Sequence, residues 1–181
     1  MATQTSETAL HCTYCGTRFA QQDGWPRTCT QCGRVTYKNP IPVVVVLLPV
    51  YGPAGLLVVR RSVAGDPGHG RLALPGGFID AGDPTWQHAA ARELREETGV
   101  CLPHEWFAQH AVRSAPDGTL LIFATARPLP LRTLPPSAST GETSGATVIY
   151  EPTELAFPLH TEVARDWFLH QRRPRLGLAA H

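Results

Sequence analysis

Runs of apolar residues separated by turn-forming residues follow one another along the chain after residue 40. Residues 120–126 (LLIFATA) are apolar nearly throughout, which predicts a central strand covered on both faces. The turn residues at 52–55 and 116–118 predict hairpins, and residues 128–145 predict a long loop. The expected strands are 41–50, 56–60, 72–74, 106–112, 120–126 and 146–150.

Two segments have the spacing of amphipathic helices instead. In the first, Asp83 predicts the N-cap, Pro84 the first helical position and Thr98-Gly99 the end. Its apolar positions Ala90 and Leu94, with Gln87 and Ala91 less strongly, predict one side packed on a sheet and the other facing a cleft. The second helix is expected over residues 160–171.

The first helix carries Glu93, Glu96 and Glu97 at i, i+3 and i+4, which places three carboxylates on one face. Like charges so spaced repel, so the cluster indicates a compensating cation, and hard oxygen ligands favour Mg²⁺ or Mn²⁺. The alternative is a solvated acidic face paired with neighbouring arginines. Upstream, Gly76-Gly77 permits close approach of backbone and ligand, which favours the metal site.

These residues resemble the Nudix box, G-x5-E-x7-R-E-U-x-E-E-x-G-U, where U is aliphatic. Gly77 matches the first glycine, and residues 92–100 match the whole second half. There is one departure. Asp83 stands where the family has glutamate, and eight residues rather than seven separate it from Arg92, so either Asp83 or Pro84 occupies that position.

The resemblance covers roughly residues 40–170 and implies an α/β fold, the Nudix α/β/α sandwich with a mixed sheet. Its zinc-ribbon branch, with NADH pyrophosphatase and ADP-ribose pyrophosphatase-like members, implies a disordered terminus and ribbon at 1–38 and a hydrolase domain at 39–181. The implied activity is divalent-metal-dependent hydrolysis of a pyrophosphate linkage, most like that of ADP-ribose and next NAD(H). The alternative is a sensor that binds ADP-ribose or NAD without cleaving it.

The resemblance also implies roles for individual residues. Arg92 orients the helix carboxylates, and Glu142, before the last strand, is the candidate general base; the alternative for Glu142 is an exposed loop carboxylate. Phe157 either stacks on a base or packs in the core, with packing slightly preferred. The expected catalytic residues are Arg92, Glu93, Glu96, Glu97 and Glu142. The expected ligands of Mg²⁺ or Mn²⁺ are Gly77, Glu93, Glu96 and Glu97. The expected substrate-binding residues are Arg60, Arg61, Gly76, Gly77 and Phe157.

A separate motif near the start is Cys-x2-Cys-x13-Cys-x2-Cys, formed by Cys12, Cys15, Cys29 and Cys32. In a chain without a secretory signal this spacing favours a structural tetrathiolate Zn²⁺ site over two disulfides or redox pairs. The ribbon hairpin is expected to pair residues 17–19 with 35–37, and Cys101 is expected to be buried among apolar residues.

Composition and charge limit the classes of partner that the chain is expected to bind. The net charge of +1 favours neither a nucleic-acid nor a membrane partner, and the run at 43–48 is too short to span a bilayer. The polar first residues contain no signal peptide, which predicts a cytoplasmic protein acting on a small nucleotide. Similar ribbon-bearing proteins are often dimers, so the resemblance adds a homodimer as an expectation.

Overall fold

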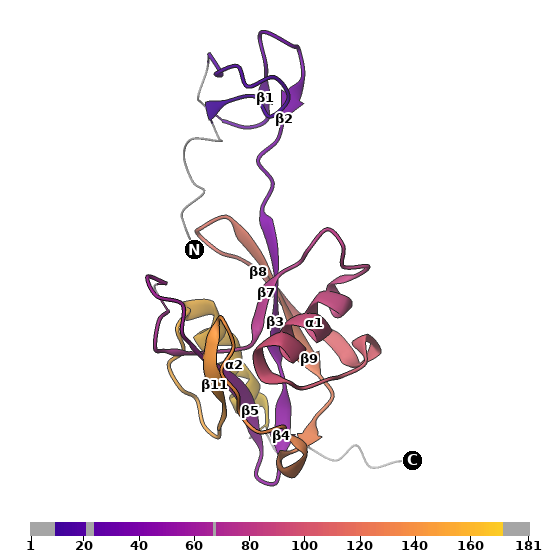
Figure 1. Cartoon of the computed structure of the whole chain (residues 1–181), viewed down its shortest axis with the longest axis vertical. Coiled ribbons are helices and arrows are strands. Elements are labelled where there is room, and N and C mark those ends of the chain that lie inside the picture. Colours follow the sequence, from indigo (N-terminus) through magenta and orange to yellow (C-terminus); the bar gives the residue numbers. More distant parts are fainter. Residues whose placement is uncertain (1–9, 21–23, 67, 172–181) are drawn as a thin grey trace. The chain divides into compact units, whose positions relative to one another are not determined.

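The computed structural model describes residues 10–20, 24–66 and 68–171. Of residues 1–10, which the sequence predicts to be disordered, residues 1–9 lie outside the described residues. The chain divides into two compact units, Met1–Pro40 and Ile41–His181 (Figure 1). Each unit has its own hydrophobic core, and among the described residues the smaller core consists of Cys12, Phe19 and Cys29, with Trp25 packed against them.

In the first unit, β1 (Arg27–Thr28) pairs antiparallel with β2 (Val35–Thr36). The prediction of a strand at 35–37 was right in place, but its expected partner at 17–19 was wrong. Arg18 instead forms an isolated bridge with His11, and Phe19 turns into the small core. The core needs the Phe19 ring because the ribbon has few other apolar side chains to bury.

The second unit contains two sheets. One has the order β7-β3-β9-β8 and is mixed, because β3 and β9 run parallel while the other pairs are antiparallel. The other has the order β10-β4-β5-β11, with β6 also paired to β5. The strands are β3 (Ile41–Leu47), β4 (Pro49–Tyr51), β5 (Gly55–Arg61), β6 (Leu72–Ala73), β7 (Gly76–Phe78), β8 (Phe107–Ser114), β9 (Thr119–Ala126), β10 (Leu129–Pro130) and β11 (Thr143–Ile149).

The predicted single strand at 41–50 is in fact two strands in different sheets. β3 ends at Leu47, and β4 begins at Pro49, which pairs with Leu56 of β5. Pro49 has no N–H to donate, so it cannot continue the β3 ladder and is tolerated at the first position of a new strand. The apolar run hides this change of sheet, because residues buried in either sheet look alike in sequence.

Two helices cover opposite faces of these sheets. Successive side chains of β3 point to opposite faces of the sheet and pack in two different hydrophobic clusters. Val44 and Val46 pack in the cluster that contains Leu94 of α1 (Trp86–Thr98). Val45 packs with the cluster that contains Trp167 of α2 (Pro158–Gln171). β9, with the fully buried Phe123, lies between β3 and β8, which confirms the predicted central strand and the α/β/α sandwich.

The predicted start of α1 was wrong by two residues. Thr85 is the N-cap, with extended dihedrals, and the helix begins at Trp86 rather than Pro84. Asp83 does not cap the helix, because its carboxylate is bound by Arg92 and by the Asp80 N–H. The predicted end is confirmed: Gly99 takes the left-handed conformation (φ 74°) and its N–H donates to the Arg95 carbonyl.

The segment expected as one loop at 128–145 contains short regular elements. It includes β10, the 3₁₀ turn η3 (Leu131–Thr133) and the first residues of β11. A second 3₁₀ turn, η2 (His104–Trp106), precedes β8. Within the described part of the chain, no helix is long and apolar enough to cross a membrane.

Candidate functional site: a carboxylate cluster on helix α1

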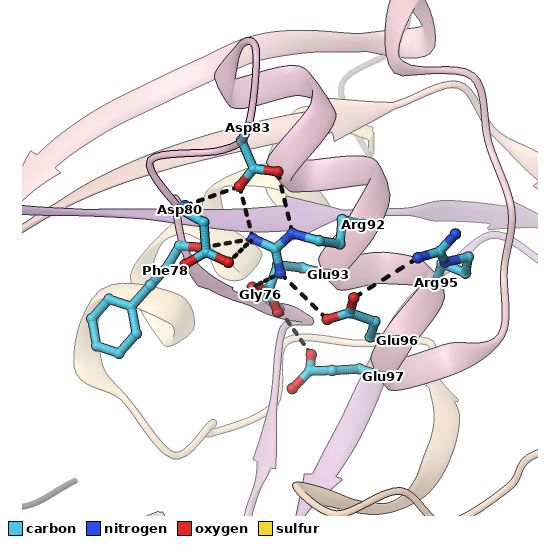
Figure 2. Close-up of polar contacts among 9 residues, drawn as sticks. All are labelled: Gly76, Phe78, Asp80, Asp83, Arg92, Glu93, Arg95, Glu96 and Glu97. Atoms are coloured by element: carbon cyan, nitrogen blue, oxygen red, sulfur yellow. Dashed lines mark hydrogen bonds and ion pairs between the residues drawn. The ribbon is translucent and has the colours of Figure 1, made fainter.

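Arg92 is the centre of the polar network on α1 (Figure 2). Its Nη1 donates to Glu93 Oε1 at 2.7 Å and to Glu96 Oε2 at 3.3 Å. Its Nη2 donates to the Phe78 carbonyl of β7 at 3.0 Å. The Arg92 guanidinium therefore links Glu93 and Glu96 to β7, the strand that contains Gly76 and Gly77. These contacts are of the kind that an orienting role for Arg92 requires.

Asp83 binds the other side of the same guanidinium. Arg92 Nε donates to Asp83 Oδ1 at 3.2 Å, and Nη2 donates to Oδ2 at 2.9 Å, in the paired geometry typical of arginine and carboxylate. These hydrogen bonds hold the pKa of Asp83 below its ordinary value. Of the two candidates for the altered position, Asp83 is thus the one that reaches Arg92, and Pro84 makes no such contact.

Glu93 is buried against Gly77. A Cβ added at Gly77 would lie 2.6 Å from the carboxyl carbon and both oxygens of Glu93, so any side chain there would displace the carboxylate. Burial raises the pKa of Glu93 above its ordinary value, against the opposing effect of Arg92. Gly77 in β7 therefore allows the close approach to its backbone that the sequence suggested. The group that approaches is the Glu93 carboxylate of the protein itself.

Glu97 is only 3% exposed and is the most buried carboxylate of the site. Its Oε2 accepts a hydrogen bond from the Gly76 N–H at 2.9 Å, while its buried Oε1 has no hydrogen-bond partner. Burial raises the pKa of Glu97 to about 7, and the charge of Glu93 adds to this while the Gly76 N–H opposes it. A buried acceptor without a partner is costly, and a cation would satisfy it.

Glu96 is different, because half of its side chain is exposed. It accepts from Arg92 and lies 3.8 Å from Arg95 (Figure 2). Glu93, Glu96 and Glu97 thus present one exposed and two buried carboxylates along one helix face. This donor set fits Mg²⁺ or Mn²⁺, which bind carboxylate oxygen and keep several waters rather than requiring a closed protein cage.

Glu142 directly precedes β11, and the next residue, Thr143, contacts the backbone carbonyl of Glu97 at 3.3 Å. Glu142 is exposed, and its charge contributes, after larger effects, to the raised pKa of Glu93 and of Glu97. The structure therefore brings the backbone next to Glu142 into contact with the end of α1.

The two predicted substrate-binding arginines face different surroundings. Arg61 pairs with the buried Asp66 through Nε at 2.9 Å and through Nη2, and its guanidinium lies over the Phe157 ring, 5.2 Å from the centroid. Its charge also acts on Glu97. Arg60 is exposed and donates to the Gly70 carbonyl. Of these two arginines, Arg61 is therefore the one whose charge acts on a helix carboxylate.

Gly76 and Phe157, also expected to bind substrate, have protein partners in this structure. The Gly76 N–H is used by Glu97, and the Phe157 ring lies 4.9 Å from the buried His160 ring as well as under Arg61. Phe157 is half-buried and belongs to neither core cluster of the second unit, so its role stays a prediction.

The four predicted zinc ligands come together in the first unit. Their Sγ atoms all lie within 4.8 Å of one another, with 3.7 Å between Cys12 and Cys32 and 3.6 Å between Cys15 and Cys29. A tetrahedral site with Zn–S bonds of about 2.3 Å places sulfur atoms about 3.8 Å apart. A disulfide would need about 2.05 Å, so the thiols are free and the donor set fits Zn²⁺.

Three site features escaped the sequence interpretation. Asp66 anchors Arg61, Asp83 anchors Arg92, and the buried Thr143 contacts the Glu97 backbone. Only Asp83 carried a sequence signal, as the acidic residue at the altered position. Cys101 was expected to be buried but is exposed, because it follows the helix-ending Gly99 on the surface.

Comparison with known proteins agrees with this geometry. The chain is 23% identical over 167 residues to the NAD-capped RNA hydrolase NudC of Escherichia coli O157:H7, covering 92% of this chain and 54% of that protein. It is 34% identical over 100 residues to the human mitochondrial coenzyme A diphosphatase NUDT8, covering 53% and 42%. The chain therefore spans about half the length of these curated relatives.

A solved structure shares the fold over nearly the whole chain. The NUDIX hydrolase from Nitrosomonas europaea superposes with a TM-score of 0.64 at 23% identity, covering 91% of this chain and 94% of the other. The family model described as the NUDIX domain matches residues 40–171, which include Gly76, Gly77, the α1 carboxylates and Glu142. Together with the arrangement around Arg92, this match shows that the chain belongs to the NUDIX family.

Proposed function

We propose that the chain is a divalent-metal-dependent hydrolase that cleaves the pyrophosphate linkage of a nucleoside diphosphate derivative. ADP-ribose or a close analogue is the first candidate, and NAD(H) the second. The observation that carries the proposal is the pair of buried carboxylates on α1, with Glu97 Oε1 lacking any hydrogen-bond partner. Such a pair is costly in a metal-free protein and is explained by a cation.

In this proposal Glu93, Glu96 and Glu97 hold Mg²⁺ or Mn²⁺, with the Gly77 carbonyl as a further ligand. When bound, such ions neutralise phosphate charge and lower the pKa of a coordinated water. Arg92 keeps Glu93 and Glu96 oriented, and Asp83 keeps Arg92 in place. Arg61 is the residue proposed to contact the substrate phosphates, because its partner across the β5–β11 ladder, Thr143, contacts the Glu97 backbone.

Glu142 is the proposed general base. Its carboxylate accepts a proton from the water that attacks phosphorus, while the bridging P–O bond breaks and the leaving phosphate retains the electron pair. Its position next to Thr143, whose hydroxyl contacts the Glu97 backbone, supports this role.

The substrate class is supported by the names of the two relatives, which refer to NAD-capped RNA and coenzyme A. Both compounds contain a diphosphate esterified to a nucleoside, as ADP-ribose does. The choice of ADP-ribose over NADH rests on the sequence. The stretch typical of NADH pyrophosphatases is missing after the box, and residues 155–160 resemble ADP-ribose-type relatives.

A sensor that binds ADP-ribose without cleaving it is the second candidate, favoured by the altered spacing at Asp83-Pro84. The pairing of Asp83 with Arg92 weakens this reading, because the altered position still supplies a carboxylate to the guanidinium.

Product analysis by chromatography decides between the two candidates. We would incubate ADP-ribose, NADH, NAD⁺, coenzyme A, dinucleoside polyphosphates, nucleoside triphosphates and an NAD-capped RNA with the full chain and Mg²⁺ or Mn²⁺. Cleavage of at least one diphosphate derivative is expected. Glu96→Gln and Glu97→Gln should each lose about a hundredfold or more of the turnover and keep the wild-type circular dichroism spectrum.

The exposed Glu151→Gln is the matched control and should leave turnover unchanged. If the wild-type protein binds ADP-ribose and no compound is cleaved, the sensor is correct and the hydrolase proposal is wrong. The structural Zn²⁺, the homodimer and the cytoplasmic location remain predictions of the same proposal.

A further inference from the structure

Thr143, at the start of β11, is completely buried although the residues on either side of it are exposed. It immediately follows Glu142, the proposed general base. A buried hydroxyl needs hydrogen-bond partners, so the partners of Thr143 show what holds this part of the chain in place.

The Thr143 hydroxyl reaches helix α1. Its Oγ1 donates to the backbone carbonyl of Glu97 at 3.3 Å. This carbonyl lies in the last turn of α1, where helix carbonyls lack intrahelical partners. Thr143 therefore satisfies an open acceptor on the very residue whose carboxylate is the most buried in the site.

A second hydroxyl extends this contact back to Glu142. Thr140 Oγ1 lies 3.1 Å from Thr143 Oγ1 and accepts from the Glu142 N–H at 3.2 Å and the Thr143 N–H at 3.0 Å. Because Thr143 donates to Glu97, the Thr140 hydroxyl must donate to Thr143. The result is a continuous chain from the Glu142 N–H, through the Thr140 and Thr143 hydroxyls, to the Glu97 carbonyl.

The other side of Glu142 is also fixed. Its carbonyl accepts from the Ser62 N–H at 2.9 Å, just beyond Arg61, the partner of Thr143 across the β5–β11 ladder. Without such restraints, repulsion from Glu93 and Glu97 would favour movement of the Glu142 carboxylate away from the helix.

We propose that Thr143 is a positioning residue for the hydrolytic reaction. The hydroxyl chain from Thr140 through Thr143 to the Glu97 carbonyl, which we call the threonine clasp, sets the distance between Glu142 and the carboxylates of α1. The proposal rests on the proposed function in one respect, namely that Glu142 acts in turnover.

A double-mutant cycle tests the clasp. Thr143→Val keeps the volume and removes the hydroxyl, while Thr143→Ser keeps the hydroxyl. Thr143→Val should lower kcat about tenfold with KM within about twofold, and Thr143→Ser should restore kcat to within about twofold of wild type. In a Glu142→Gln background, Thr143→Val should cause no further loss, because the group it positions is already gone.

Thr125→Val in β9 is the matched control, because the buried Thr125 hydroxyl has no hydrogen-bond partner. It should leave kcat unchanged. An equal loss of kcat from Thr143→Val in both backgrounds, or no loss in either, would overturn the proposal.

Hydrogen exchange followed by mass spectrometry separates the clasp from the proposed function. The amides of Glu142 and Thr143 should exchange at least about tenfold faster in Thr143→Val than in wild type or Thr143→Ser, whether or not any substrate is cleaved. Unchanged exchange would overturn the clasp itself. Faster exchange in a protein that hydrolyses nothing would overturn only the proposed function.

Discussion

The two predicted metal sites differ in how much of the protein supports them. The four thiols of the ribbon are already within 4.8 Å of one another, around a core of three buried residues. The α1 carboxylates rest on a large core and are spaced by Arg92 rather than gathered together. Under our proposal, the ribbon metal would substitute for a core, whereas in the helix site the core would hold ligands that are unfavourable until a metal binds.

Removing a thiol ligand should have the largest effect. Cys29→Ser is expected to abolish zinc binding, which is about one ion per chain in wild type, and to unfold the ribbon, because structural zinc contributes about 10–16 kcal/mol to such modules. Metal analysis and limited proteolysis within residues 10–40 would measure this. Cys101→Ser, at an exposed cysteine outside the cluster, should retain the zinc.

A metal-free ribbon that stays folded with two disulfides would remove the contrast between the sites. It would show that the thiol spacing of 3.6–3.7 Å closes to covalent bonds rather than around an ion.

Loss of the Asp83 carboxylate should have an intermediate effect on turnover. Asp83→Asn removes the charge that fixes Arg92, so turnover should fall about ten- to hundredfold, the range seen when residues that orient metal ligands are lost. Steady-state kinetics with Mg²⁺ would measure it. Asp80→Asn is the control, because Asp80 is mostly exposed and lies 3.6 Å from the guanidinium; a change below about threefold is expected.

If Asp80→Asn were as damaging as Asp83→Asn, Asp83 would not be the residue that replaces the family glutamate. The carboxylate at the altered position would then have to be sought elsewhere in residues 78–84.

The smallest effect expected is on stability in magnesium-free buffer. Glu97 has an ordinary pKa of 4.5 in the unfolded chain and a raised pKa of about 7 in the folded protein, so the folded state retains a proton that the unfolded state releases. Stability should therefore fall as the pH rises from 4.5 to 7 and remain lower above that. Glu97→Gln removes this cost and should raise the free energy of unfolding by roughly 1–2 kcal/mol at pH 8, with a much smaller gain at pH 5.

Denaturant unfolding at the two pH values would measure this difference. Glu96→Gln, at the half-exposed carboxylate, is the comparison variant and should give a smaller gain at pH 8 than Glu97→Gln, because less burial is relieved. An equal gain from both variants would mean that the buried and exposed carboxylates of α1 are equivalent, contrary to the structure.

The sequence predicted the elements whose signal is local. The box motif located α1 and its carboxylates, Gly99 predicted the helix end, and the cysteine spacing predicted the thiol cluster. The change of sheet at Leu48 was missed, because burial in either sheet produces the same apolar run.

Long-range polar contacts were missed for a different reason. The Thr143 hydroxyl and the Glu97 carbonyl are 46 residues apart, and the carbonyl is a backbone group that carries no residue identity. Asp83 was first interpreted as a helix cap because its sequence neighbours favour one, and only the fold shows the competing partner, Arg92.

The parallel pairing of β3 with β9 also bears on how the protein folds. The β3–β9 ladder pairs residues 41–47 with residues 119–125, so it can form only after both segments are available. The chain between these two segments contains α1. Helix α1 can therefore form early, and Gly76 and Gly77 can pair with Val45 and Val44 on one edge of β3 before β9 joins the other edge. During synthesis β3 remains unpaired with β9 until residues 119–125 have emerged, so the four-stranded sheet beneath α1 is completed late in the synthesis of the second unit.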